Sequence, residues 1–370
     1  MADEFDIPEP DRVDGAPHPR ATLALFGQAA AEQAFLAAQG GGRMHHAWMI
    51  TGPRGIGKAT LAWRIARFVL AGGGDDGLFG APESLDIAPD HPVARRILAL
   101  GEPGLHLARR SYDDKTKKLK TVISVDDIRA LKSFFNLSAA EGGWRVAIVD
   151  AADELNSAAA NALLKILEEP PARTLILLVC HQPARLLPTI RSRCRALRCQ
   201  PLCDADLGRA LVAAGLDAGN DLPALAALCE GSVGEAARLM ASGGVALYRG
   251  IISMLAGAPG LDRAAVAKLG MACSGAANAD TYDNTIRLTL LALSRLARAG
   301  AGVPLNVVDA LEGRMLARLS PSQAAARNWA ALSQEQTARL AHARAVNLDP
   351  AQMILDTFLQ IDTEARRCAS

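Results

Sequence analysis

A glycine-rich turn between an apolar segment and an amphipathic segment constrains the fold of this chain more than any other feature. Residues 44–70 read MHHAWMITGPRGIGKATLAWRIARFVL, which predicts a short strand, a tight turn and a helix. Gly52, Gly55 and Gly57 let the backbone N–H groups, together with the positive end of the next helix, surround a phosphate. Lys58 would supply the cation. This order is that of a P-loop, which predicts an α/β domain with a nucleotide-binding turn.

One position of the turn departs from the P-loop pattern. Ala59 follows Lys58 where the pattern has a Ser or Thr whose hydroxyl holds Mg²⁺. Thr60 comes one residue later, and a step of roughly 100° around a helix points it away from the phosphates. The sequence therefore predicts a P-loop fold and argues against ATP hydrolysis by this chain.

Composition limits the classes of protein to which the chain can belong. A length of 370 residues predicts two or three domains, and 50% hydrophobic with 21% charged residues is typical of a folded soluble protein. The net charge of +1 exerts no general attraction on nucleic acid or membrane, so a DNA contact would be a local patch. Without a membrane-span pattern or a signal-peptide pattern, we expect a cytoplasmic protein with no membrane partner.

The cysteines indicate a reducing compartment more than a metal site. There are seven, an odd number, and no C-x-x-C pair occurs. Cys194, Cys199 and Cys203 lie close together in the sequence, which leaves zinc open as the minor alternative to strand and loop thiols.

Two further apolar runs predict buried parallel strands. RVAIVD, residues 145–150, ends in Asp150, whose carboxylate would lie at the carboxyl edge of the sheet, where such sheets bind ligands. In a P-loop protein this carboxylate is the second magnesium group. TLILLVC, residues 174–180, follows a predicted helix over 156–168 that Pro170 and Pro171 stop.

Two clusters of positive charge each allow two interpretations. DDKTKKLK, residues 113–120, is either a solvated hairpin tip or a loop that contacts phosphates. The arginine cluster is either an edge strand with solvated charges or a site that binds an anion, DNA included. It comprises Arg191, Arg193, Arg195 and Arg198.

The order of predicted elements suggests four parts. Residues 1–20, acidic with four prolines, predict a flexible N-terminus. Residues 21–200 predict the P-loop domain, beginning with a helix over 22–39. No convincing strand follows, so we expect a small helical part over 201–243 and a larger helical part over 244–370.

Three stretches in this order resemble the bacterial clamp-loader family of AAA+ proteins. They are HHAWMITGPRGIGKATLA, WRVAIVDAADELNSAAANALLKILEEPP and LLPTIRSRC, and the resemblance covers residues 20–200. It implies a RecA-like AAA+ P-loop domain followed by an all-α lid and an all-α C-terminal collar. It also implies a role as a clamp-loader subunit of the replicative DNA polymerase III holoenzyme. The partners would be the gamma or tau motor subunits and delta, with the sliding clamp and primed DNA reached through the complex.

Departures from the active ATPases of this family are as informative as the matches. Active members have a hydroxyl at Ala59, a catalytic Glu at Ala151 and an arginine at Gly234. Without these groups, nothing activates the attacking water or senses the γ-phosphate in this chain. The Ser192-Arg193-Cys194 triplet is intact, and in the family its arginine reaches ATP bound by the neighbouring subunit. The resemblance thus implies that Arg193 acts in trans.

Three expectations stay open at this point. The chain could be a gamma- or tau-like motor ATPase, which Lys58 and Asp150 favour. It could instead hold ATP or ADP without hydrolysis through Gly52, Gly55, Gly57, Lys58, Thr60 and Asp150. Many relatives carry a four-cysteine zinc module after the P-loop helix, but residues 71–110 contain no cysteine, so we expect no zinc.

Overall fold

The computed structural model describes residues 8–39, 44–73, 82–113, 115–136 and 143–369 and divides the chain into two compact units. The N-terminal unit comprises Met1–Asp217 and Gly231–Ala237, and the C-terminal unit comprises Ala218–Glu230 and Arg238–Ser370. The boundaries predicted at 200 and 243 are not boundaries of compact units. The reason is that residues 231–237 pack on the P-loop, so the predicted lid is shared between the two units.

A five-stranded parallel sheet forms the centre of the N-terminal unit, with strand order β2-β5-β6-β1-β7. The strands are β1 (Ala47–Thr51), β2 (Leu105–Arg109), β5 (Arg145–Asp150), β6 (Thr174–Cys180) and β7 (Arg195–Arg198). All seven residues of β6 are buried, as its unbroken apolar run predicts. The predicted strands and the α/β class of this unit are therefore confirmed.

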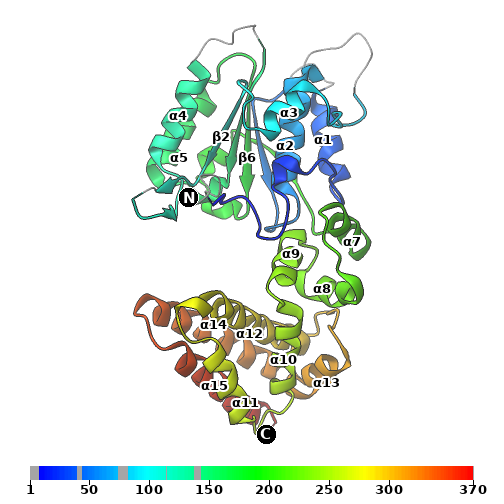
Figure 1. Ribbon diagram of the computed structural model, residues 1–370, viewed down its shortest axis with the longest axis vertical. Helices are drawn as coiled ribbons and strands as arrows, with labels where there is room; N and C mark the ends of the chain where they lie inside the picture. The colour runs from blue at the N-terminus through cyan, green and yellow to red at the C-terminus, as the bar shows by residue number, and fades with distance from the viewer. Residues whose placement is uncertain (1–7, 40–43, 74–81, 114, 137–142, 370) are drawn as a thin grey trace, which may run out of the picture. The chain divides into compact units, whose positions relative to one another are not determined.

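Helices cover both faces of the sheet (Figure 1). One face carries α4 (Val125–Asn136) and α5 (Ser157–Glu168); the other carries α1 (Ala29–Gln39), α2 (Lys58–Phe68) and α3 (Pro92–Leu98). Ile128 and Leu131 of α4 pack with Leu163 of α5 against inward-facing residues of the sheet. Asn156 caps α5, its side-chain oxygen accepting a hydrogen bond from the N–H of Ala159 at 2.8 Å.

The first helix is shorter than predicted. It begins at Ala29 instead of residue 22, because Gly27 has a left-handed φ of 70° that no helix accepts. The side chain of Gln28 then spans two segments, donating to the carbonyls of Ile56 at 3.0 Å and Gln200 at 2.7 Å. Tertiary hydrogen bonds therefore determine where this helix starts.

Shorter elements complete the N-terminal unit. The hairpin of β3 (Tyr112–Asp113) and β4 (Lys118–Leu119) follows β2, and α6 (Pro188–Arg191) follows β6. α7 (Asp204–Ala213) completes the regular structure up to Asp217. β7 is an edge strand whose Arg195 and Arg198 are exposed, as the solvated-strand interpretation predicts, and the Arg195 guanidinium lies 5.1 Å from the Trp48 ring centroid.

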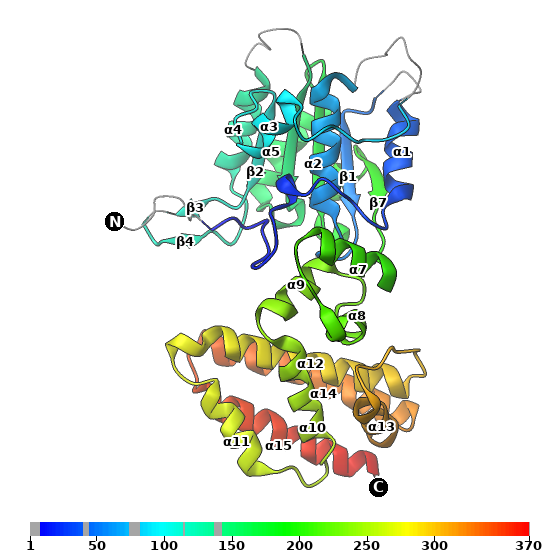
Figure 2. The same cartoon turned by 45° about the vertical axis from the view of Figure 1, so that its right-hand side comes forward.

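The C-terminal unit is entirely helical among its described residues, which confirms the predicted all-α character (Figure 2). Its long helices α12 (Ala279–Gly300) and α14 (Gln323–Ala345) pack together, and α11 (Arg263–Ala272) packs on α15 (Pro350–Ala369). The remaining helices are α8 (Leu222–Cys229), α10 (Gly244–Leu255) and α13 (Ala310–Leu319), and α9 (Val233–Ala241) crosses the boundary between units. Among described residues, no helix is both long and apolar enough to span a membrane.

A buried ion pair lies inside the C-terminal unit. The guanidinium of Arg295 and the carboxylate of Glu312 are 1% and 0% exposed, and two hydrogen bonds of 2.7 and 3.0 Å join them. The hydroxyl of Tyr248 donates to Glu312 at 2.6 Å, and the N–H of Val308 donates to it at 2.7 Å. Arg295 Nη1 donates to the carbonyl of Ala227, and Nη2, which also binds Glu312, donates to the carbonyl of Asn306. Because the charges are paired and hydrogen-bonded, their burial is tolerated.

Candidate nucleotide site and arginine segment

The predicted P-loop lies between β1 and α2, and its three glycines adopt the left-handed backbone. The φ angles are 143° at Gly52, 74° at Gly55 and 97° at Gly57. A Cβ at Gly52 would lie 2.7 Å from the carbonyl oxygen of Cys199, so any side chain there would force the backbone apart. The structure thus gives two physical reasons for glycine at these positions: the positive φ of all three and the close packing against Gly52.

The charged groups of the site lie at the carboxyl edge of the sheet. Lys58 is the first residue of α2 and is 2% exposed, and its ammonium donates to the carbonyl of Pro53. Burial lowers the pKa of Lys58 to about 8, although Asp150 is among the groups that oppose this shift. Burial raises the pKa of Asp150 to about 7; Asp11 adds to this and Lys58 opposes it. The structure therefore brings Lys58 and Asp150 together, as predicted.

The site lacks one of its two magnesium groups, at Ala59, and the water-activating carboxylate, at Ala151. Ala59 and Ala151 carry no oxygen on their side chains, and Thr60 is buried within α2. The glycines and Lys58 fit a phosphate, but only Asp150 is left to serve a magnesium ion among the positions that the family uses. This arrangement fits nucleotide binding better than hydrolysis.

Residues 232–234 close over the loop from one side. The hydroxyl of Ser232 donates to the carbonyl of Arg54 at 2.9 Å, and the N–H of Gly234 donates to the carbonyl of Gly55 at 3.0 Å. A Cβ at Gly234 would lie 3.0 Å from the Cα of Gly55. Gly234 therefore allows a close backbone contact at the position where active relatives have an arginine.

His181 belongs to the same edge, and sequence reasoning missed it. It directly follows β6, and its backbone N–H donates to Asp153 at 2.8 Å. Burial, together with the charges of Lys58 and Arg54, lowers the pKa of His181 to about 4. Its Nδ1 has no hydrogen-bond partner among the described residues. The available signal was its place after an apolar strand, the same signal that identified Asp150.

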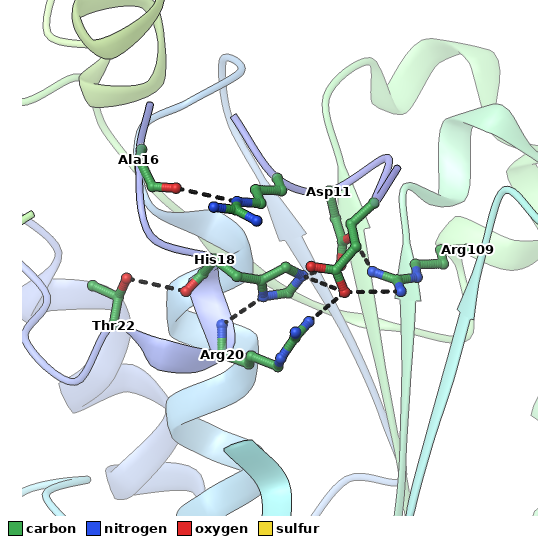
Figure 3. A network of polar contacts seen from close by, with 8 residues as sticks. Asp11, Ala16, His18, Arg20, Thr22 and Arg109 are labelled. Carbon is green, nitrogen blue, oxygen red and sulfur yellow. Dashed lines mark hydrogen bonds and ion pairs between the residues drawn. The ribbon is translucent and has the colours of Figure 1, made fainter. Parts of the chain in front are cut away.

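The predicted flexible N-terminus is ordered from residue 8 onwards, while residues 1–7 lie outside the described residues. Figure 3 shows how acidic and basic side chains fasten this segment to the end of β2. His18 Nε2 lies 3.1 Å from the carboxylate of Asp11, and Arg109 binds both Asp11 and Glu9. Arg109 is paired in register with Asp150, so the segment reaches the site edge. Composition predicted flexibility because it does not reveal these long-range ion pairs.

Arg193 lies away from these groups, just after α6. Its guanidinium forms an ion pair with Glu168 at 2.9 Å and donates to the carbonyl of Thr189 at 3.0 Å. The side chain is 36% exposed, so it is accessible to another molecule. Among the described contacts, none joins Arg193 to Lys58 or Asp150.

The three neighbouring cysteines do not form a metal site in the described part of the chain, where no cluster of three potential ligands occurs. Burial raises the pKa of Cys194 to about 12 and that of Cys199 to about 11, which disfavours the thiolate that zinc requires. The expectation of no zinc remains a prediction.

The parallel sheet, the P-loop that follows β1 beside the edge strand β7, and the acidic end of β5 define a P-loop α/β domain. Residues 27–203 match the model of the family described as "DNA polymerase III, delta subunit". The resemblance to the clamp-loader family is thereby confirmed for this segment.

Two similar proteins are named DNA polymerase III subunit delta'. The one from Pseudomonas aeruginosa is 35% identical over 57% of this chain and 61% of its own length. The one from Escherichia coli K12 is 36% identical over 42% of each chain. A protein named DNA polymerase III subunit gamma/tau, from Mycobacterium bovis, is 34% identical over 41% of this chain and 24% of its own length. The chain thus spans less than two thirds of these relatives.

Proposed function

We propose that this chain is a delta'-like subunit of a DNA polymerase III clamp loader and that it completes the ATP site of a neighbouring subunit. The observation that carries the proposal is the contrast between two sets of residues. Hydrolytic groups are missing at Ala59 and Ala151, while the guanidinium of Arg193 is accessible. An arginine that approaches a transferring phosphoryl group stabilises its developing charge.

The partners follow from this role. We propose that the chain assembles with gamma or tau and delta in the cytoplasm, and that the complex acts on the sliding clamp and primed DNA. The names of the similar proteins support a polymerase III complex, and the match to residues 27–203 supports the P-loop domain as the shared part.

Within the proposed site, Arg193 would have to exchange Glu168 for a phosphate oxygen of the neighbouring nucleotide. The Arg193–Glu168 pair is accessible to solvent, and exposed pairs of this kind contribute only about 0–1 kcal/mol. The guanidinium can therefore leave Glu168 at small cost and reach a more strongly charged partner.

The test is primer-template-stimulated ATP hydrolysis by the reconstituted loader. Arg193→Ala should lower the rate tenfold or more, a modest share of the roughly 10³–10⁵ that arginine fingers can supply. Arg191→Ala is the matched control, because Arg191 is exposed in the same segment. An unchanged rate in a fully assembled Arg193→Ala complex would refute catalysis in trans.

A second candidate is a gamma- or tau-like ATPase, which the retained Lys58 and Asp150 favour. ATP turnover by the purified chain alone, abolished by Lys58→Ala, would establish it. We propose instead that any ATP or ADP at Gly52–Lys58 is bound without turnover, since the loop fits phosphate while the magnesium and water-activating groups are missing. Equilibrium dialysis with labelled nucleotide separates binding from hydrolysis.

A further inference from the structure

The hairpin after β2 carries an unusual concentration of lysine. Four of the eight lysines of the chain lie within residues 115–120: Lys115, Lys117, Lys118 and Lys120. Without them the net charge of +1 would become −3, so the rest of the chain is slightly acidic. Together with the arginine cluster over 191–198, this hairpin is one of two places where positive charge is concentrated in the sequence.

The described residues of the hairpin, 112–113 and 115–120, have a paired backbone that presents these lysines. Tyr112 pairs with Leu119 and Asp113 with Lys118, and the N–H of Lys120 donates to the carbonyl of Ser111 at 2.9 Å. The carboxylate of Asp113 accepts the N–H of Lys115 at 2.9 Å. Figure 2 shows the hairpin extending outward from the side of the domain bordered by the edge strand β2.

All four lysine side chains are exposed. No ion pair joins any of them to a carboxylate within the described ranges of the chain. The carboxylate of Asp113 makes its contacts within the turn. The backbone N–H of Lys115 and, more weakly, the charge of Lys120 lower the pKa of Asp113. The ammonium groups are thus available to an external polyanion.

The side chains of the turn favour the backbone of a nucleic-acid duplex over a single strand. Single-strand binding relies on several aromatic side chains on which successive bases stack. Residues 115–120 contain none, and the one aromatic residue of the hairpin, Tyr112, is partly buried. Lysine acts as a point charge on phosphate oxygens, which carry no sequence information. A two-stranded ribbon also fits the dimensions of a DNA groove.

We propose that the hairpin Tyr112–Lys120 binds the phosphate backbone of duplex DNA through Lys115, Lys117, Lys118 and Lys120, without sequence preference. The choice of DNA as the polyanion rests on the proposed function; the presence of a polyanion site rests on the hairpin itself. In the loader, this contact would hold the duplex part of a primed template.

The test is the salt dependence of binding of the full-length chain to a labelled DNA duplex of about 20 base pairs, followed by fluorescence anisotropy. Four phosphate contacts predict a slope of log K against log salt near −3.6, or about 100-fold weaker binding at about 200 mM than at about 50 mM salt. Replacing all four lysines with Gln should bring this slope close to zero and weaken binding at least about tenfold at low salt.

The C-terminal unit offers a control that changes the net charge equally. Arg263, Lys268, Arg314 and Arg327 are exposed there, and their combined replacement with Gln should leave the slope unchanged. Circular dichroism checks the folding of both variants. Equal losses in both variants, wild-type slope in the hairpin variant, or equally tight binding of single-stranded DNA would overturn the proposal. Assembly with partner subunits, measured on the same preparations, judges the proposed function separately.

Discussion

The buried charged groups of the two units differ in how completely they are paired. In the C-terminal unit, all three nitrogens of Arg295 donate hydrogen bonds and Glu312 accepts from three residues. At the P-loop edge of the N-terminal unit, burial dominates instead: the pKa of Lys58 falls to about 8 and that of Asp150 rises to about 7. Charged groups that the protein leaves short of partners are typical of a ligand site, whereas fully paired ones are structural.

The largest effect is expected from a substitution that breaks the buried Arg295–Glu312 pair. Glu312→Gln removes one charge and leaves the buried Arg295 unpaired, which should lower the free energy of unfolding of the C-terminal unit by about 3–5 kcal/mol. Denaturant unfolding followed by circular dichroism measures it. The control is Glu230→Gln, which breaks the solvent-accessible pair with Arg298 and should cost about 0–1 kcal/mol. Equal losses would mean that burial does not matter to the Arg295 pair.

The second prediction tests Asp150, the incompletely paired carboxylate at the P-loop edge. Because Asp150 has a raised pKa in the folded chain, the unfolded chain loses this proton first, and wild-type stability falls as pH rises from about 4 to about 7. Asp150→Asn should therefore stabilise the N-terminal unit by roughly 2–4 kcal/mol at pH 8 and hardly at all at pH 4.

Urea unfolding of this variant across the pH range makes the measurement. Asp126→Asn on α4 is the control, because its carboxylate is 80% exposed and should give no such pH dependence. A loss of stability at pH 8 would show that Asp150 is a structural carboxylate like Glu312.

The smallest effect concerns the N-terminal segment. Although burial acts to raise it, the close contact with His18 Nε2 and the charge of Arg109 lower the pKa of Asp11. Asp11 therefore stabilises the fold above its unfolded pKa, and this contribution is lost as pH falls through the folded pKa. Asp11→Asn should cost about 1–3 kcal/mol at pH 7.

Hydrogen exchange at Ala16 and Ala21, whose N–H groups donate within this segment, would reveal its release. Asp14→Asn is the matched control, since Asp14 is exposed in the same segment. Unchanged protection in Asp11→Asn would mean that Glu9, Arg20 and Arg109 suffice to hold the segment.

Much of the candidate site was predictable because its signals are local in the sequence. The P-loop glycines, the strand ending in Asp150 and the helix predicted over 156–168 depend on neighbouring residues. The structure has the strand and the helix where they were predicted, with Asn156 as the cap of the helix instead of its first residue. His181 was missed although the same local signal was present. The start of the first helix was wrong because the bonds of Gln28 join residues that are far apart in the chain.

The sequence by itself determined the order of the main strands and helices and the loop that can surround a phosphate. It also determined the loss of the magnesium-binding hydroxyl at Ala59 and of the water-activating carboxylate at Ala151. These follow from side-chain chemistry and short-range periodicity. Only the tertiary structure decided that residues 8–20 are fastened by Arg109, that Ser232 and Gly234 pack on the P-loop, and that Arg295 pairs with Glu312. Burial and long-range pairing set these contacts and the protonation of Lys58 and Asp150, and neither is written in any single stretch of sequence.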